Sequence, residues 1–168
     1  MATAEEHLVE WLRDAHAMEQ QAETMLSSFA GRVENYPDLK SRIERHLEET
    51  RQQVQIIRRC IVRRGGDTST IKDLAAKFVA MTQGFGGVFA GDEVIKGSMA
   101  SYSFEEVEIA SYTVLIAAAE ALGDHETRSA CEAILAQEEN MAQWLRAHLP
   151  EITTQYLRRE AMHLEEQH

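Results

Sequence analysis

Proline is scarce in this sequence of 168 residues, which has two prolines, at positions 37 and 150, and nine glycines. Because both residue types interrupt helices, their scarcity leaves few points at which a helix has to end. The abundant residues, Ala, Leu, Glu, Gln and Arg, favour helices. With 44% apolar residues, the chain has enough material for one core. We therefore expect a single, almost entirely α-helical domain over residues 1–168.

The sequence also lacks an uninterrupted run of 18 apolar residues, and its beginning, MATAEEHLVE, contains neither a basic nor an apolar segment. These absences argue against a membrane-spanning helix and a targeting peptide. We expect a cytoplasmic protein with no membrane partner. Two cysteines, Cys60 and Cys131, are too few for a disulfide framework in a chain of this length. Both thiols are expected to be reduced and buried.

Positive charge is in short supply, because 17 Lys and Arg residues stand against 28 Asp and Glu residues, for a net charge of −11. A nucleic-acid-binding surface needs a basic patch that displaces counterions from phosphates. Arginines cluster only between positions 58 and 64, where cations at a helix end complement the helix dipole. We therefore expect no nucleic-acid partner, and a DNA-coating role is disfavoured.

Helical periodicity divides the chain into two helical hairpins and a tail. Gly31, the Gly65 and Gly66 pair, and Gly123 end helices, Asn35 is a candidate cap, and Asp124 is a good N-cap. The predicted helices are Thr3–Ala30, Asp38–Arg64, Phe104–Leu122 and Asp124–Leu149, followed by a C-terminal helix opened by Pro150, roughly Glu151–Glu165.

The connection between the hairpins, residues 67–103, is too long for a hairpin loop. It is predicted to contain a short helix from Thr70 to Thr82, a break at GFGG, a helical piece from Val88 to Met99 and a turn. One long crossover between two hairpins is the layout of ferritin-like four-helix bundles, although a purely structural bundle has the same layout. The predicted fold class is an all-α, ferritin-like four-helix bundle with this crossover and an extra C-terminal helix.

Four glutamates interrupt the apolar stripes, one on each main helix. Glu19, Glu108 and Glu138 lie within the stripes of the first, third and fourth helices. Glu49 is less central, because it enters the stripe of the second helix only when Ile56 and Cys60 are counted as inward. A carboxylate in an apolar interior is costly unless a partner compensates it. These four positions are therefore candidate functional residues.

The spacing of the four glutamates is the same in both hairpins. Glu19 and Glu49 are 30 positions apart, Glu108 and Glu138 are also 30 apart, and each pair straddles its turn. With a rise of about 1.5 Å per residue, each carboxylate lies roughly 22 Å from its hairpin tip, near the middle of the bundle.

Carboxylates that converge in a dry core repel one another unless cations compensate them, and no Lys or Arg occupies the inward stripes nearby. Two divalent ions satisfy this requirement, since carboxylate oxygens suit iron or manganese and a glutamate can bridge both ions. Glu19, Glu49, Glu108 and Glu138 are thus predicted metal ligands. The alternative is that they are margin residues whose carboxylates reach solvent.

Histidine is placed differently from the usual di-metal carboxylate pattern, in which a His follows the Glu by three positions. Gln52 and Met141 occupy those positions here, whereas His16 and His46 each precede a candidate Glu by three. His46 lies within its stripe and is a predicted ligand, and His16 is expected to be exposed.

Three further residues neighbour the candidate glutamates. Tyr112 lies one turn beyond Glu108 and could hydrogen-bond a ligand carboxylate, or could simply be packed. Glu105 and Glu139 are expected to be solvated, because they point away from the centres of the stripes.

Three segments, HLEET at 46–50, EIASYTVL at 108–115 and AMEQQ at 17–21, resemble the YciE/YciF family of bacterial ferritin-like stress proteins. The resemblance extends from about His7 to Leu149. It implies a ferritin-like bundle, a cytoplasmic homodimer and a di-metal centre of the rubrerythrin kind. The four glutamates and His46 match the family's positions. The chain departs from the family at Glu106, where a His is common, and at Ala142, where an Asp is common.

We therefore predict a non-haem protein with two iron ions, or manganese or zinc in their place, bound by the four glutamates and His46. It would oxidise Fe²⁺ with peroxide or O₂, as a ferroxidase, or reduce peroxide, as a rubrerythrin-like peroxidase, during stress. The alternative is a metal-free helical interaction module that binds a protein partner through its acidic surface and last helix.

Overall fold

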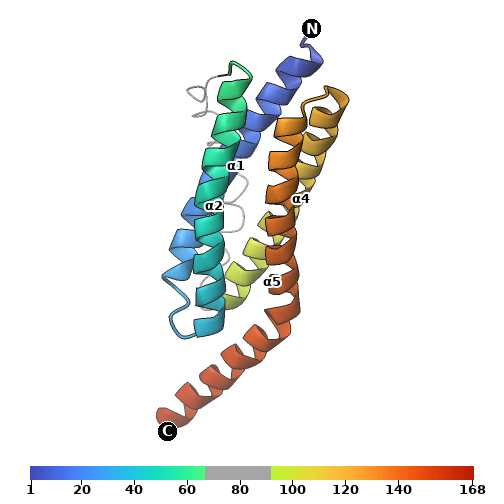
Figure 1. Cartoon of the computed structure of the whole chain (residues 1–168). Helices are drawn as coiled ribbons and strands as arrows, with labels where there is room; N and C mark the ends of the chain where they lie inside the picture. The colour runs from blue at the N-terminus through green and yellow to red at the C-terminus, as the bar shows by residue number, and fades with distance from the viewer. Residues whose placement is uncertain (67–91) are drawn as a thin grey trace.

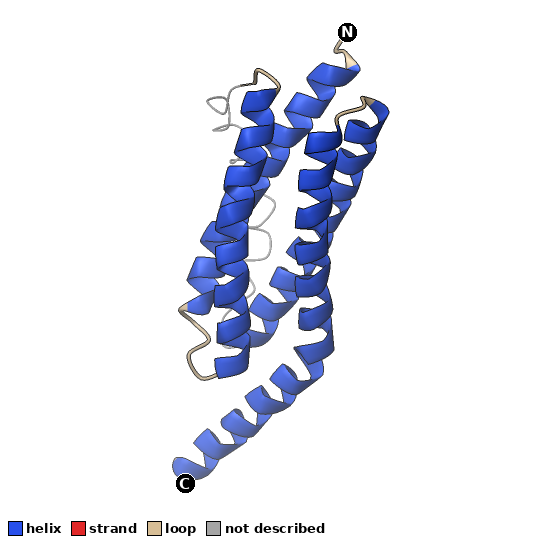
Figure 2. Cartoon of the chain, viewed as in Figure 1, coloured by secondary structure: helices blue, strands red, loops and turns tan. Residues whose placement is uncertain are grey.

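The computed structural model describes residues 1–66 and 92–168. Four long helices lie side by side in these ranges, and the described residues contain no strand (Figures 1 and 2). The predicted all-α, ferritin-like bundle is thus confirmed. The helices are α1 (Ala4–Ala30), α2 (Pro37–Arg63), α4 (Glu93–Ala121) and α5 (His125–Glu166).

The ends of the two hairpins follow local sequence signals. Thr3 caps α1 in a capping box with Glu6, and Gly31 follows its last residue. Pro37 is the first residue of α2, where a proline costs no hydrogen bond. The predicted cap at Asn35 is wrong, because α2 is preceded by Tyr36, which makes no side-chain cap. Gly123 ends the α4 region with φ +66°, a conformation that other residues rarely adopt.

The beginning of α4 differs from the prediction. The predicted turn between Met99 and Phe104 is wrong, since α4 is continuous from Glu93. The hydroxyl groups of Ser98 and Ser103 bond to carbonyl oxygens four residues earlier, so the helix accommodates them. Burial of Val94 and Ser98 against the bundle then outweighs their weak helix propensity. The other predicted pieces of the connection, in residues 67–91, lie outside the described residues.

The C-terminal helix is not separate, because Pro150 lies inside α5. A proline within a helix removes one backbone hydrogen bond and bends the helix rather than always ending it. Beyond the bend, α5 turns away from the bundle (Figure 1). Ile152 and Tyr156 still pack in the apolar cluster that contains Ile43 and Leu145. This packing stabilises the helix on the far side of the proline.

The bundle core consists of two apolar clusters with a polar layer between them. One cluster contains Leu12 and Ile134, and the other contains Ile43 and Leu145. Along α2, α4 and α5, the residues between the clusters include buried histidine and glutamate side chains. The apolar clusters hold the helices together on either side and fix the polar layer at mid-bundle.

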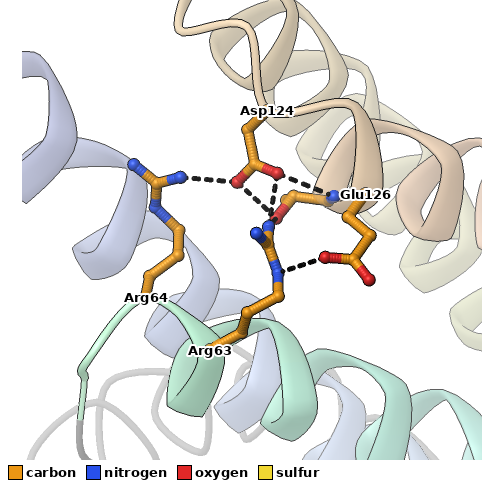
Figure 3. A network of polar contacts seen from close by, with 5 residues as sticks. Arg63, Arg64, Asp124 and Glu126 are labelled. Carbon is orange, nitrogen blue, oxygen red and sulfur yellow. Dashed lines mark hydrogen bonds and ion pairs between the residues drawn. The ribbon is translucent and has the colours of Figure 1, made fainter.

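A buried aspartate joins the two hairpins at one end of the bundle (Figure 3). Asp124, before α5, accepts hydrogen bonds from Arg63, from Arg64 at 2.6 Å and from the backbone of Thr127 at 3.1 Å. These bonds outweigh the effect of burial and hold the pKa of Asp124 well below its ordinary value. Two of the clustered arginines are thereby assigned to an ion-pair network between α2 and α5. Arg63 also contacts the exposed Glu126 at 3.0 Å.

Within residues 1–66 and 92–168, no helix combines the length and the apolar character that crossing a membrane requires. Cys60 and Cys131, the two cysteines, are both buried as free thiols, as expected.

Candidate metal centre

The structure buries four of the five predicted ligands at mid-bundle. Glu19 on α1, His46 on α2, Glu108 on α4 and Glu138 on α5 are each at most 1% exposed. They come from four different helices, so each helix contributes at least one side chain to the polar layer. The position of Glu49 is different and is described below.

A compact cluster forms around His46. One ligand atom each from His46, Glu105, Glu108 and Glu138 lie within 4.8 Å of one another. The His46 Nε2 atom is 2.9 Å from Oε1 of Glu105 and 3.3 Å from Oε2 of Glu138. Neither contact has hydrogen-bond geometry, so Nε2 is left as an unpartnered buried nitrogen. An imidazole nitrogen among three carboxylates is a donor set that suits iron, manganese or zinc.

Glu49 lies at the margin and contacts the other nitrogen of His46. Its side chain is 17% exposed, and its Oε2 lies 3.0 Å from His46 Nδ1. Because a carboxylate accepts and does not donate, this contact places a hydrogen on Nδ1. Nε2 can then be the coordinating nitrogen when the ring is neutral. Glu49 is therefore placed to orient His46 toward the cluster.

Tyr112 donates a hydrogen bond to one of the glutamates. Its hydroxyl group, on α4, lies 2.6 Å from Oε1 of Glu19, on α1. Burial and the neighbouring Glu19 raise the pKa of Tyr112 well above its ordinary value, so the phenol stays protonated and donates. The hydrogen bond that the sequence suggested is thus present, on Glu19 rather than on the glutamate of the same helix.

Glu105 is one of two residues whose burial differs from the prediction made from the sequence. It was expected to be solvated, yet it is 2% exposed and contacts His46. The inward face of α4 passes through Ser101, Glu105, Glu108, Tyr112 and Leu115, which have a heptad-like spacing. The apolar stripe read from the sequence runs through Phe104, Ser111 and Ala118 instead, one position before Glu105, Tyr112 and Ala119. That spacing was the available signal.

The structure also shows whether His16 and Glu139, two further neighbours of the candidate glutamates, are buried. His16 was expected to be exposed, but it is 4% exposed, and burial and the nearby Arg58 lower its pKa. Packing of α1 against α2 brings this margin position inward. Glu139 is exposed, as expected.

Burial raises the pKa of three carboxyl groups in the layer. The pKa values of Glu19, Glu105 and Glu108 lie well above the ordinary value, because desolvation and neighbouring carboxylates both disfavour their charge. For Glu138 burial acts in the same direction, but contacts with Glu105 and His46 outweigh it and lower the pKa. Burial lowers the pKa of His46, yet the carboxylates of Glu138 and Glu49 raise it to about 9.

A half-buried arginine also acts on this layer from outside the inward stripe. Arg42, one turn before His46 on α2, interacts electrostatically with Glu49 and more weakly with Glu105 and Glu138. No ion pair within 4 Å joins Arg42 to a carboxylate among the described residues. Arg42 therefore does not supply the hydrogen-bond partners that the buried carboxyl oxygens of the layer lack.

The unpartnered oxygens of the cluster test whether a metal fits. Both side-chain oxygens of Glu108 and Glu138, and one oxygen each of Glu19 and Glu105, are buried without a hydrogen-bond partner. Buried polar groups in proteins are nearly always paired, so six such atoms at one level indicate missing partners. Carboxylate oxygens that receive no hydrogen bond can instead coordinate divalent cations. The donor set therefore fits a metal centre.

Removing the Tyr112 hydroxyl is expected to weaken metal binding without unfolding the bundle. Tyr112→Phe leaves Glu19 without the donor that orients it, and loss of such a group typically lowers metal affinity about tenfold or more. Competition with a chromogenic chelator measures the change. Tyr102→Phe, a half-buried tyrosine on the same helix, is the control and should leave the affinity unchanged. Equal affinities of Tyr112→Phe and wild type would contradict an orienting role.

Comparisons with known proteins agree with this fold. The family model described as "Domain of unknown function (DUF892)" matches residues 3–158. A crystal structure of a protein from Xanthomonas campestris pv. campestris is similar to this chain with 44% identity and a TM-score of 0.81, over 95% of this chain and 99% of that one.

Two further solved structures share the architecture. The Escherichia coli stress protein YciF is 22% identical, with a TM-score of 0.80 over 92% of this chain and 99% of that chain. YcfI from Rhodopseudomonas palustris is 25% identical, with a TM-score of 0.70 over 86% of this chain and 94% of that chain. The likeness to YciF is one of fold.

Proposed function

Because the chain belongs to the DUF892 family and has the fold of YciF, we propose that it is a ferritin-like di-metal carboxylate protein. It binds two iron or manganese ions and takes part in iron oxidation or peroxide removal under stress. The observation that carries this proposal is the set of buried, unpartnered carboxylate oxygens of Glu19, Glu105, Glu108 and Glu138 around Nε2 of His46.

The ligands divide between two positions. His46, Glu105, Glu108 and Glu138 would hold one ion, since their ligand atoms already lie within 4.8 Å of one another. Glu19, whose Oε2 has no partner and which interacts electrostatically with Glu138, would help to hold the second ion. Glu49 contacts the distal nitrogen of His46 and is assigned an orienting role instead of direct ligation.

Bound iron or manganese would supply the exchange of electrons with O₂ or peroxide. The chain's own contributions are positional. Two apolar clusters on either side exclude water from the ligand layer. Glu49 holds the His46 ring, and Tyr112 holds Glu19. These contacts hold the carboxylate ligands in position to bind cations. Without cations, the same carboxylates would destabilise the site.

Metal analysis of the purified protein tests the proposal directly. Protein loaded with Fe²⁺ without oxygen, or with Mn²⁺, and then desalted should retain about two ions per chain. The double variant Glu19→Ala with Glu108→Ala should retain none, because it removes a ligand from each position. Glu139→Ala, an exposed neighbour, should retain both ions. Absorbance during addition of H₂O₂ or O₂ to the Fe²⁺-loaded protein then shows which oxidant is used.

Two results would overturn the proposal. The first is a wild-type protein that retains no metal and whose melting temperature chelators leave unchanged, as expected for a metal-free interaction module. The second is full metal retention by the double variant, which would place the ions elsewhere. Retained metal without oxidation of Fe²⁺ or loss of peroxide would limit the function to metal binding.

A further inference from the structure

The positive charge of this acidic protein is concentrated toward the end of α2. Residues 51–66 contain five arginines and no Asp or Glu, in a chain whose net charge is −11. Arg63 and Arg64 pair with Asp124, and Arg51 pairs with acidic residues of α1 and α2. Internal contacts therefore account for three of the five arginines.

The other two arginines, Arg58 and Arg59, are not accounted for in this way. Both are exposed, and within residues 1–66 and 92–168 neither makes an ion pair within 4 Å. The helix dipole does not explain them, because α2 ends at Arg63 and the effect of the dipole falls off within the last turn. Arg59 and Arg63 are four positions apart, a spacing at which like charges repel and destabilise a helix. The arrangement thus lowers stability without an internal compensation.

The two arginines border a hollow on the surface of α2. It has a volume of about 380 Å³ and is lined by Gln55, Arg58, Arg59, Val62 and Arg63, which we call the α2 patch. Val62 is 60% exposed and lies one helical turn from Arg58 and Arg59. An exposed apolar side chain bordered by guanidinium groups has the composition of a small protein interface, with an apolar centre and a polar rim.

We propose that the α2 patch binds a short acidic segment of another polypeptide. Carboxylates of the segment contact Arg58 and Arg59, because a planar guanidinium group binds a carboxylate through two parallel hydrogen bonds. An apolar side chain of the segment packs on Val62. The rest of the chain carries the excess of negative charge and repels an acidic partner. The attraction is therefore confined to the patch.

The length of the α2 patch fits a peptide better than a nucleic acid. From Gln55 to Arg63 the patch extends about 12 Å along the helix, which an extended peptide of about four residues covers. A DNA duplex carries a charge about every 1.7 Å along a longer surface. Beyond the patch a duplex would meet exposed acidic residues such as Glu48 and Glu126. We therefore assign the patch to a peptide.

Fluorescence anisotropy with a synthetic peptide tests the proposal on the full chain. The probe is a short fluorescein-labelled peptide of glutamates with a central leucine. Wild type should bind it at low salt with a Kd of about 100 µM or tighter, and salt should weaken binding because the contacts are exposed. Replacing the glutamates of the peptide by glutamines should abolish binding. Replacing its leucine by serine should weaken binding about threefold or more, since the contact with Val62 is lost.

Substitutions in the α2 patch test the same contacts from the side of the protein. The double variant Arg58→Gln with Arg59→Gln keeps good helix formers and should weaken binding at least about tenfold. Arg146→Gln with Arg158→Gln removes the same charge from exposed positions of α5. This control should change the Kd by less than about twofold, because salt screens distant charges. Arg63 is left unchanged, since its ion pairs join α2 to α5.

A fluorophore at Val62 shows where the peptide binds. Val62→Cys labelled with an environment-sensitive dye should change its emission when unlabelled peptide is added. Leu157→Cys, at a 59% exposed position of α5, is the matched control and should not respond. The native cysteines are buried, so the label attaches to the introduced thiol. Metal content should not affect the result, because His46 lies about 18 Å before Arg58 along α2.

Four results would overturn the proposal. The first is a wild type that does not bind the peptide, which includes the case in which residues 67–91 of the same chain cover the patch. The second is full affinity of the Arg58→Gln with Arg59→Gln variant, and the third is equal binding of the glutamine peptide. The fourth is tighter binding of a single-stranded DNA of equal charge, which would assign the patch to nucleic acid.

Discussion

Glu108→Gln is expected to raise the melting temperature of the metal-free protein and to lower that of the metal-loaded protein. Without metal, Glu108 is a buried carboxyl group whose charge is disfavoured by desolvation and by Glu105, Glu138 and Glu19. A neutral side chain of the same shape relieves this cost by about 1 to 2 kcal/mol, which is roughly 2 to 8 °C for a domain of this size.

With metal, the difference in melting temperature between the variant and wild type reverses its sign, because wild type is stabilised by the free energy of metal binding. At a free metal concentration about 1,000 times the dissociation constant, that gain is about 4 kcal/mol, or roughly 8 to 16 °C. The variant has lost a ligand and gains little. Thermal melts of wild type and Glu108→Gln, each with a chelator and with excess Mn²⁺, measure all four values.

The control for this experiment is Glu139→Gln, which changes the net charge by the same amount at an exposed position. Its melting temperature should follow wild type in both conditions. If Glu108→Gln shifts the melting temperature in the same direction with and without metal, the result would contradict the metal centre. The Glu108 carboxylate would then not destabilise the metal-free protein and stabilise the metal-loaded one, as a ligand should.

Asp124→Asn is expected to lower the free energy of unfolding at pH 7 by about 2 to 3 kcal/mol. The substitution keeps a good N-cap but removes the charge that Arg63 and Arg64 share. Breaking a buried ion pair costs about 3 to 5 kcal/mol, and the partial exposure of Arg63 reduces that figure. Urea unfolding measures the difference.

The cost of Asp124→Asn should depend on pH in a defined direction. The pKa of Asp124 is lower in the folded protein than in the unfolded chain. Its carboxylate therefore stabilises the fold fully above the unfolded pKa of about 3.9, and this contribution is lost as pH falls through the folded pKa. The difference between wild type and variant should thus be constant from about pH 5 to 7 and should shrink below pH 4.

Glu126→Gln provides the control for the network. Glu126 contacts the same Arg63 at 3.0 Å, but its side chain is 75% exposed. An exposed pair contributes little, so this variant should lose less than about 0.5 kcal/mol. If Asp124→Asn and Glu126→Gln lowered the free energy of unfolding equally at pH 7, the strength of the Asp124 ion pairs would not come from burial.

Local sequence signals were sufficient to predict most of the helix ends. Thr3, Pro37, Gly123 and Asp124 act on their immediate neighbours through caps and backbone conformation, which depend on a few residues. The equal 30-residue spacings also placed Glu19, Glu108 and Glu138 at one level, because the rise of a helix per residue is constant.

The tertiary structure decided which neighbouring residues face inward. Successive residues of a helix differ by about 100°, so a small rotation of α4 in the bundle buries Glu105, and packing of α2 leaves Glu49 at the margin. Such rotations are fixed by the packing of the four helices against one another. The apolar periodicity of a single helix carries no information about that packing. Packing beyond Pro150 likewise kept α5 continuous. The sequence by itself determined the helices and the level of the acidic layer, whereas the tertiary structure determined the ligand set.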